Sequence, residues 1–408
     1  MSTLSLPESD RGRALAQCQT NVAELLVQSP EEQHRFGYFH TLGEICQQPS
    51  TWRQTSKLMQ RSTSALRGRI KGIQSLVLTG SGSSEYVGDC VRLPLQCALG
   101  IVTEAIGGGA ILAHGSKRLP PGRPGLMVSL ARSGDSPESV GALTHILKTE
   151  PEIQHLVLTC NAAGRLATAF SGDSRVTVIT LDKTTNDQSL VMTSSFTNLL
   201  LGARFLGLIN DAKRYQDISE KAAKIAEQII GEYFETLAQA AKAPFQRAVF
   251  LGSGASFGAA REAGLKMLEM TAGRVTTLCE TYLGLRHGPM SYIHDDSLIV
   301  GFLSSDPILR AYETDLLREV NQKGLGLLKV VVGEDIPSDL IGENDAALEC
   351  SGLKELGDEN TPIVHVLVGQ LLAFFRCLYE GLRPDSPSEN GVISRVVQSF
   401  TLHLPEEK

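Results

Sequence analysis

The chain repeats part of its own sequence at a spacing of 172 residues, from Gly80 to Gly252, and this duplication limits the fold more than any other feature. The segment Ser75–Gly82 resembles Ala248–Gly254. Further segments align with or fall near one another at the same spacing: Leu126–Ser129 with Leu298–Gly301, Leu156–Thr159 with Leu328–Val331, and Asn198–Leu206 with Gln370–Leu378. These alignments introduce no gap. The sequence therefore predicts two homologous domains.

Each repeat contains four apolar runs separated by segments of helical pattern. The runs are Leu76–Thr79, Gly125–Leu130, His155–Thr159 and Val176–Leu181, then Val249–Leu251, Ser297–Leu303, Leu327–Val332 and Ala347–Ser351. Because they are apolar on both faces, they are typical of parallel strands covered by helices on both sides. We predict an α/β protein with two tandem doubly wound parallel-sheet domains, residues 71–215 and 216–382. A helical segment, residues 1–70, precedes them, and an irregular tail, residues 383–408, follows.

Charge and composition exclude several classes of function. The chain has 38 Lys+Arg against 45 Asp+Glu, a net charge of −7. An acidic chain without long basic runs is a poor binder of nucleic acid and of anionic membranes. Residues 1–13 lack the apolar core of a secretion signal, and no apolar stretch approaches the ~18 residues of a membrane span. The eight cysteines form no CxxC pair and no Cys/His cluster suited to zinc. We expect a reduced, cytoplasmic protein.

The first repeat has a Gly-Ser turn at the end of its first apolar run, Gly80–Glu85. The turn is not a dinucleotide-binding fingerprint, which would need glycine at position 85. Ser83 and Ser84 would stand at the start of a helix, where hydroxyls and backbone N–H groups suit a phosphate monoester. A turn that only caps its helix explains the same residues about equally well.

A stronger candidate site is the run Arg132–Ser139. Pro137 fits the first helical position and Ser136 the N-cap, which would leave Ser133 and Ser136 around exposed N–H donors. Arg132 adds a permanent cation with several donors. Glu138 would oppose an anion if it pointed inward. The arginine and two serines favour an anion site over a plain cap.

A third serine-rich turn, Thr193-Ser194-Ser195, precedes the helical run Phe196–Leu206. Its hydroxyls could be simple caps, and they become of interest because ligands bind beyond the carboxyl ends of parallel strands. The second repeat keeps Ser304 and Ser305 but lacks the arginine. The anion site is therefore assigned to the first repeat.

The second repeat offers groups for proton transfer. Glu262, Lys266 and Glu269 share one face of a predicted helix, Phe257–Ala272. They are either an exposed stripe with an ion pair, or a base, Glu269, whose charge Lys266 tunes. His287 lies beside a Gly-Pro corner, where a histidine is more often structural, although its ordinary pKa suits proton transfer near neutrality.

Together these motifs resemble the sugar isomerase (SIS) family, specifically its tagatose-6-phosphate ketose/aldose isomerase type, also described as galactosamine-6-phosphate deaminase/isomerases. The resemblance covers the chain from about Glu44 to Thr401 and rests on these segments: Gly80–Ser84, Arg132–Ser139, Met192–Ser195, Leu251–Gly254, Leu265–Gly273, Arg286–Pro289 and Arg395–Gln398. It implies two flavodoxin-like SIS domains and a homodimer that shares its active site between subunits.

The resemblance also implies roles for individual residues. The phosphate-binding serines of the related glucosamine-6-phosphate synthase correspond to Ser83, Ser84, Ser133 and Ser136, with Arg132, Thr193 and Ser194 beside them. Glu269 corresponds to the proton-shuttling glutamate, Lys266 to the lysine one turn earlier, and His287 to the ring-opening histidine, which the neighbouring subunit contributes there. Arg395 replaces that enzyme's Schiff-base lysine, and a permanently protonated guanidinium cannot form the imine. The glutaminase domain is absent, so glutamine is not the ammonia source.

The implied reaction is aldose–ketose isomerisation of a hexosamine 6-phosphate, with deamination when the 2-substituent is an amine, and it requires no cofactor. Two alternatives stay open from the residues alone. One is a sugar-phosphate-binding regulator that lost the chemistry, although residues 1–70 show no basic recognition helix. The other is a fructosamine-phosphate deglycase, which needs the same phosphate site and base.

Overall fold

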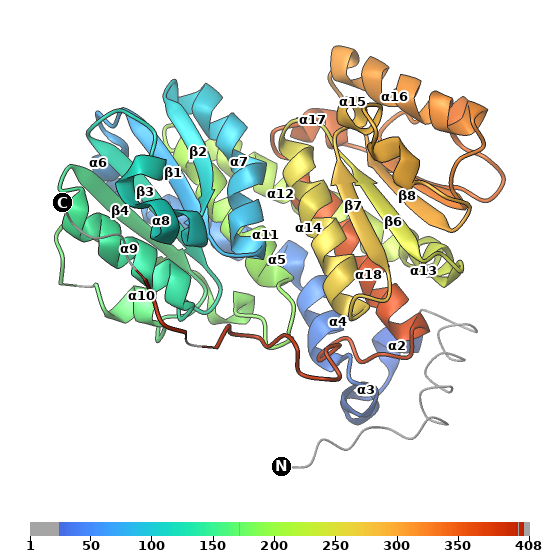
Figure 1. The fold of residues 1–408 in the computed structure, drawn as a ribbon, viewed down its shortest axis with the longest axis horizontal. Helices are drawn as coiled ribbons and strands as arrows, with labels where there is room; N and C mark the ends of the chain where they lie inside the picture. The colour runs from blue at the N-terminus through green and yellow to red at the C-terminus, as the bar shows by residue number, and fades with distance from the viewer. Residues whose placement is uncertain (1–23, 171, 399, 404–408) are drawn as a thin grey trace. The chain divides into compact units, whose positions relative to one another are not determined.

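Two five-stranded parallel sheets, one for each repeat, form the framework of the protein (Figure 1). The computed structural model describes residues 24–170, 172–398 and 400–403. Residues 1–23 and 404–408 lie outside the described residues. The predictions made for residues 1–13, for the rest of the first 23 residues and for the end of the tail therefore lie outside them too. The chain divides into two compact units. The first-repeat unit holds residues 48–187, 194–223 and the stretch from Ser394, and the second-repeat unit holds the described residues up to Gln47, 188–193 and 224–393.

The first-repeat sheet has the strand order β2-β1-β3-β4-β5, with every neighbouring pair parallel. Its strands are β1 (Ser75–Gly80), β2 (Val102–Gly107), β3 (Gly125–Ala131), β4 (Ile153–Thr159) and β5 (Val176–Thr180). The helices of this unit are α5 (Gln48–Arg61), α6 (Thr63–Ile70), α7 (Ser83–Leu99), α8 (Gly108–His114), α9 (Pro137–Thr149), α10 (Arg165–Thr168) and α11 (Ser194–Arg204). The long helix α12 (Ala212–Glu232) continues from this unit into the next.

Alternation along the strands divides the apolar residues of the first-repeat unit between two faces. Val77, Met127 and Val157 pack with Ile111 of α8 and Leu143 of α9 in one buried cluster. The intervening residues face the other side. There a Cβ on Gly88 of α7 would lie 3.2 Å from the Cβ of Leu78, and one on Gly202 of α11 would lie 2.8 Å from Leu158. Helices therefore cover both faces of the sheet, as the apolar runs predicted.

The second-repeat sheet has the strand order β10-β9-β8-β6-β7. Its strands are β6 (Arg247–Leu251), β7 (Thr276–Glu280), β8 (Ser297–Phe302), β9 (Leu328–Gly333) and β10 (Ala346–Glu349). The helices of this unit are α2 (Glu24–Val27), α3 (Pro30–Phe36), α4 (Phe39–Cys46), α13 (Phe234–Lys242), α14 (Ala255–Met270), α15 (Tyr282–Leu285), α16 (Pro307–Gln322), α17 (Leu353–Leu356) and α18 (Pro362–Tyr379). Short 3-10 helices join the elements of both units: Gly115–Arg118, Lys183–Thr185, Phe205–Leu208, Pro289–Tyr292 and Ser338–Leu340.

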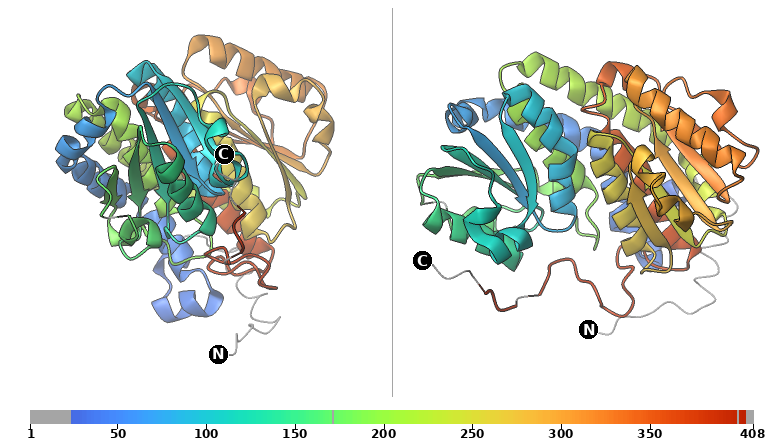
Figure 2. Two further views of the ribbon diagram at one scale, coloured as in Figure 1. Left: turned by 60° about the vertical axis from the view of Figure 1, so that its left-hand side comes forward. Right: turned by 45° about the horizontal axis from the view of Figure 1, so that its top comes forward.

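The two sheets have the same topology when each is numbered from its own first strand, namely 2-1-3-4-5, the flavodoxin-like order. In the second-repeat unit α15 and α16 cover one face through Leu285 and Leu316, and α14 and α18 pack together on the other (Figure 2). The prediction of two doubly wound parallel sheets related by duplication is confirmed.

The alignment without gaps was wrong in detail. Ser75 and Arg247 begin equivalent strands 172 residues apart, and each lies beside the start of the third strand of its sheet. Leu126, however, pairs with Gln154, whereas Leu298, its counterpart, pairs with Leu328. The spacing between β4 and β9 is therefore 174, two more than the spacing between β1 and β6. Connecting loops and helices can change length while strand register stays the same.

Four strands per repeat were predicted, and the structure has five. The missing ones, β2 and β7, are the edge strands beside β1 and β6. Their sequences, VTEAIG and TTLCE, mix polar and apolar residues, and Val102 is 46% exposed. An edge strand has only one neighbour and is partly open to solvent, so it lacks the continuous apolar run that identified the central strands.

Predicted and observed domain limits differ. The helices before residue 71 do not form a segment of their own, because α4 belongs to the second-repeat unit and α5 to the first. The tail is divided in the same way, between Ile393 and Ser394. Within the second-repeat unit, Asp385 of the tail accepts hydrogen bonds from the backbone N–H of His40 and Thr41 at 3.2 and 2.7 Å.

Helix α18 is the apolar centre of the second-repeat unit. Among the described residues it is the one helix whose 18-residue length and composition would suffice to cross a membrane, and 94% of it is buried inside the protein. It packs closely on α14 (Figures 1 and 2), where a Cβ added to Gly369 would lie 2.4 Å from the Cβ of Ala263. The helices can approach this closely only because residue 369 has no side chain.

This contact predicts the effect of a single methyl group. The variant Gly369→Ala should lower the free energy of unfolding by about 1–3 kcal/mol, because the added carbon overpacks a rigid core. Gly231→Ala, in α12, is the matched control because no atom lies within 4 Å of its added Cβ. That variant should gain up to about 1 kcal/mol in helix propensity. Urea unfolding measures both, and equal changes in the two variants would contradict the packing account.

Candidate functional site

The turn after β1 is built around two glycines. A Cβ on Gly80 would lie 2.6 Å from the backbone carbon of Ser84, and Gly82 has a φ of 58°. The second repeat has the same requirement at Gly252, at 2.3 Å from Ser256, and at Gly254, with a φ of 55°. The glycines let the chain leave the strand and enter α7 at once. Ser83 and Ser84 are consequently the first two residues of α7, and both are buried.

The turn after β3 leaves backbone donors available. Ser136 takes the N-cap position of α9 and Pro137 the first helical position, as predicted, but the Ser136 side chain makes no capping hydrogen bond. The hydroxyl of Ser133 accepts the N–H of Asp135 at 3.2 Å. Among the described residues, no acceptor meets the N–H groups of Ser133, Gly134 and Ser136. Free N–H groups at the positive end of a helix attract an anion.

Two arginines meet at this turn. A side-chain nitrogen of Arg132 donates to the backbone carbonyl of Arg395, although the two residues lie far apart in sequence. The Arg395 side chain donates in turn to the carbonyl of Asp187 and to Oδ1 of Asn186, both at 2.7 Å. Arg132 is only 8% exposed. The first-repeat unit thus has Arg132, together with N–H groups that lack an acceptor among the described residues, at the carboxyl end of β3. The guanidinium of Arg395 is held at the loop after β5.

The third predicted turn lies fully inside the protein. Thr193, Ser194 and Ser195 are all buried, and Ser194 begins α11. The carboxylate of Asp187 accepts the N–H and the hydroxyl of Ser195 at 3.0 and 2.5 Å. Thr193 belongs to the second-repeat unit, where its carbonyl accepts from Gln370 at 3.2 Å. Asp187 is therefore the cap of α11, which the sequence analysis did not identify.

A buried hydrogen-bonded network holds α11 against α5. Nε1 of Trp52 donates to the hydroxyl of Thr197 at 2.9 Å. The amide of Asn198 donates to Thr51 at 2.9 Å and accepts from Thr55 at 2.7 Å. Buried polar groups that are satisfied in this way specify one arrangement of two helices. The network therefore fixes the helix whose first turn carries Ser194.

In the second-repeat unit, α14 carries a buried row of three charges. Glu262 and Lys266 are fully buried, and the side chain of Glu269 is 24% exposed. Nζ of Lys266 lies 3.3 Å from Oε1 of Glu262 and also forms an ion pair with Oε2 of Glu269. Of the two interpretations left open for this row, the exposed stripe is wrong, because this face of α14 is inside the unit. Burial of a charge is costly and needs this compensation.

His287 lies apart from those charges. It follows α15 in an exposed loop, and its backbone N–H donates to the carbonyl of Gly284 at 3.0 Å. The neighbouring Gly288 has a φ of 123°, which only glycine adopts readily. Within the second-repeat unit, no hydrogen bond or ion pair among the described residues joins His287 to Glu269. The structure therefore brings together two of the three residues predicted for catalysis.

The counterpart of the anion turn in the second repeat is occupied by the protein itself. The carboxylate of Asp358 accepts the N–H groups of Ser305 and Asp306 at 2.8 and 3.2 Å. Glu313 accepts the N–H of Ser304 at 2.7 Å. Glu313 is buried, and mainly for that reason its pKa is raised from 4.5 to about 7. The assignment of the anion site to the first repeat alone agrees with this difference.

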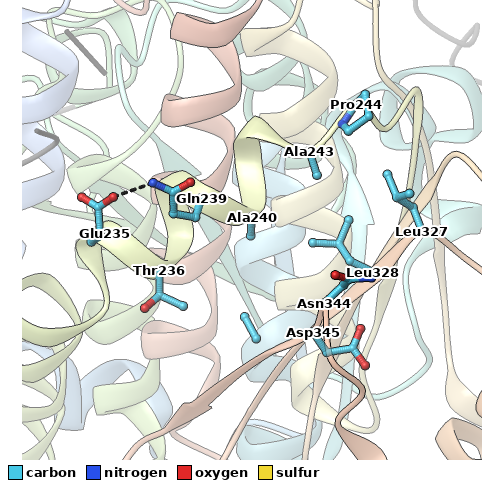
Figure 3. A pocket seen from close by; sticks show the side chains of 11 residues that line it. Glu235, Thr236, Gln239, Ala240, Ala243, Pro244, Leu327, Leu328, Asn344 and Asp345 are labelled. Atoms are coloured by element: carbon cyan, nitrogen blue, oxygen red, sulfur yellow. Dashed lines mark hydrogen bonds between the residues drawn. The ribbon is translucent and has the colours of Figure 1, made fainter. Parts of the chain in front are cut away.

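The second-repeat unit also has a pocket of about 590 Å³, shown in Figure 3. It lies between α13, with Glu235 and Gln239, and the chain entering β9 and β10, with Leu328 and Asp345. This is the amino end of the strands, opposite the edge where such sheets bind ligands. It contains none of the residues predicted for the site. Among residues 24–170, 172–398 and 400–403, no group of three His, Cys, Asp or Glu side chains could hold a metal ion.

Comparison with known proteins places this arrangement among sugar-phosphate enzymes. A Streptomyces coelicolor protein described as a candidate D-galactosamine-6-phosphate deaminase is 37% identical over 89% of this chain and 95% of its own. The D-galactosamine-6-phosphate deaminase of Shewanella sp. is 33% identical over 93% of this chain and 95% of its own. The tagatose-6-phosphate ketose/aldose isomerase of Escherichia coli superposes with a TM-score of 0.79 at 27% identity, covering 89% of this chain and 96% of that one. No family model matches the chain.

The raised pKa of Glu313 predicts how stability changes with pH. A carboxyl whose pKa is higher in the folded state stabilises the fold fully below pH 4.5, and this contribution is lost as the pH rises to about 7. Relative to Glu313→Gln, the wild type should therefore lose about 3 kcal/mol of unfolding free energy across this interval. Urea unfolding at several pH values measures the difference. Parallel curves for the wild type and Glu313→Gln would contradict the prediction, and Glu343→Gln controls for removal of an exposed carboxylate.

Proposed function

The chain belongs to the SIS family of sugar isomerases, among the D-galactosamine-6-phosphate deaminases, and we propose that it converts galactosamine 6-phosphate into tagatose 6-phosphate and ammonia. It is a sugar-phosphate deaminase/isomerase. The observation that carries the residue-level proposal is the ion pair between buried Lys266 and the partly exposed Glu269. This ion pair holds the carboxylate of Glu269 at a partly buried position, where the carboxylate can exchange protons with a substrate.

The sugar phosphate binds at the turn after β3. The phosphate oxygens accept hydrogen bonds from the backbone N–H groups of Ser133, Gly134 and Ser136. The hydroxyl of Ser136 and the guanidinium of Arg132 lie beside these donors. Charge-assisted hydrogen bonds of this kind are about twice as strong as neutral ones. In an acidic chain the attraction must be local, and the helix start of α9 provides it. The remaining contacts to the sugar are assigned to four further residues: Ser83, Ser84, Thr193 and Ser194.

The reaction is a transfer of protons followed by hydrolysis. His287 moves the proton of the ring oxygen, and the sugar opens to its aldehyde. Glu269 takes the proton from C2, which leaves an enolamine, and returns a proton to C1. The product is a C2 imine, and water cleaves it to the ketone and ammonia. C1 is reduced and C2 is oxidised by the same transfer, so no external oxidant or reductant is needed.

Lys266 positions the base. Its ammonium lies between two carboxylates, 3.3 Å from Oε1 of Glu262 and in an ion pair with Oε2 of Glu269. Arg395 stands where the related synthase has its Schiff-base lysine. Since a guanidinium stays protonated, Arg395 orients the substrate and the loop at Asp187 and forms no covalent bond to the sugar.

The proposal also includes the oligomeric state of the enzyme and its location in the cell. The exposed loop of His287 is suited to reach the active site of a second copy, so the working form is a homodimer with shared sites. The enzyme acts in the cytoplasm. Its last step makes it a hydrolase as well as an isomerase.

The first test concerns the base. Glu269→Gln should lower kcat for release of ammonia from galactosamine 6-phosphate by about 10²–10⁴, the range for a lost general base. Glu343→Gln, an exposed glutamate of the same unit, should keep its activity. Ammonia and tagatose 6-phosphate are measured in parallel, with circular dichroism as the folding control. Near-wild-type turnover in folded Glu269→Gln would remove this residue as the base.

The second test concerns the phosphate. Arg132→Ala should raise KM for galactosamine 6-phosphate about 10–100-fold, because a charged hydrogen bond of about 1.5–3 kcal/mol is lost. It should leave kcat/KM for unphosphorylated galactosamine unchanged. Arg165→Ala removes an exposed arginine of the same unit and should alter neither value. An equal loss of kcat/KM on both sugars would show that Arg132 does not bind the phosphate.

A further inference from the structure

The pocket between α13 and the strands β9 and β10 combines apolar walls with a few polar groups (Figure 3). Its volume of about 590 Å³ lies within the range of about 300–1,000 Å³ that small-molecule sites occupy. Ala240 of α13 and Ala243 at the end of this helix line the pocket, together with Leu327 and Leu328 at the start of β9. Because alanine side chains are short, they leave space between α13 and the two leucines.

The same side of α13 carries polar groups of the pocket. Thr236 lies one turn before Ala240, and Glu235 and Gln239 lie beside them. Nε2 of Gln239 donates to Oε1 of Glu235 at 2.7 Å, as the dashed line in Figure 3 shows. Among the described residues, Oε2 of Glu235 and the hydroxyl of Thr236 have no hydrogen-bond partner. The pocket therefore offers a carboxylate oxygen and a hydroxyl to a ligand that donates hydrogen bonds.

The charge of the pocket is negative. Two carboxylates, those of Glu235 and Asp345, are the ionisable groups among its lining residues. Asp345 is compensated within the protein, because it accepts the N–H groups of Lys329 and Gly342 at 2.6 and 2.7 Å and forms a buried ion pair with Nζ of Lys329. The charge left for a ligand is therefore that of Glu235. With no cation among its lining residues, the pocket suits an organic cation and not a phosphate.

We propose that this pocket binds an organic ammonium ion with an apolar body. The ammonium group lies against Oε2 of Glu235 and the hydroxyl of Thr236, and the apolar body packs on Ala240, Ala243 and Leu328. Burial of the apolar body supplies most of the affinity, and the exposed carboxylate supplies a modest preference for positive charge. The pocket shares no residue with the proposed sugar-phosphate site, so the inference holds whether or not the chain has the proposed activity.

The experiment is a titration of the full chain by isothermal calorimetry with three probes of the same shape and different charge. They are the cation tryptamine, the neutral alcohol tryptophol and the anion indole-3-propionate. Tryptamine should bind one site with a dissociation constant of about 1 mM, as expected for a ligand of this size. Tryptophol should bind about 2–5-fold more weakly, which is the worth of an exposed ion pair, and the anion more weakly still.

Variants place the probes in this pocket. Glu235→Gln should weaken tryptamine about 2–5-fold and leave tryptophol unchanged, because only the charge is lost. Glu232→Gln is the matched control, since Glu232 is also exposed and accepts from an amide one turn away, that of Gln228 at 3.0 Å, but does not line the pocket. It should keep the wild-type affinities. Ala243→Phe fills the space with a ring and should abolish binding of tryptamine and tryptophol.

Unfolding midpoints provide a second readout that does not depend on the heat of binding. A ligand that binds only the folded state raises its stability with concentration. Tryptamine should therefore raise the midpoint of the wild type and of Glu232→Gln by more than that of Glu235→Gln. The proposal would be overturned by a wild type that does not bind tryptamine, by equal affinity for all three probes, or by Glu235→Gln with wild-type affinity for tryptamine.

Discussion

The buried ammonium of Lys266 is the constraint on which the second-repeat unit depends. A lysine with no exposed surface must be compensated, and α14 supplies a carboxylate one turn before it and another one turn after. Glu262 lies fully inside, whereas part of Glu269 is exposed. The same arrangement that makes the buried charge tolerable therefore leaves one carboxylate, that of Glu269, partly exposed. Structure and proposed chemistry depend on one ion pair.

Duplication explains the rest of the architecture, and divergence explains the assignment of roles. Both repeats keep the 2-1-3-4-5 strand order and the Gly-Ser-Gly turn, because each turn requires the close approach of backbone at Gly80 or Gly252. Among the described residues, the turn of the first copy has N–H groups without an acceptor and an arginine, Arg132, beside them. The second copy filled its turn with Asp358 and placed its charges on α14. In the proposed mechanism, one fold thus supplies a phosphate-binding half and a proton-transfer half.

The sequence was sufficient for features that depend on local pattern. Central strands were predicted because they are continuous apolar runs, and the cap position of Ser136 because proline follows it. Features that depend on packing were missed. Glu262, Lys266 and Glu269 have the spacing of an exposed stripe, and only the packing of α14 inside its unit shows that they are buried. Asp187 and Asp358 act across loops, so no short spacing in the sequence identifies their partners.

The most direct test is a panel of 6-phospho sugars with ammonia and ketose measured in the same reaction. The panel contains galactosamine 6-phosphate, tagatose 6-phosphate, a fructosamine phosphate and unphosphorylated galactosamine. The proposed function predicts that galactosamine 6-phosphate yields tagatose 6-phosphate and ammonia in equal amounts, and that the unphosphorylated sugar reacts far more slowly. Binding of the phosphosugar with no turnover, or ammonia released only from the fructosamine phosphate, would contradict it.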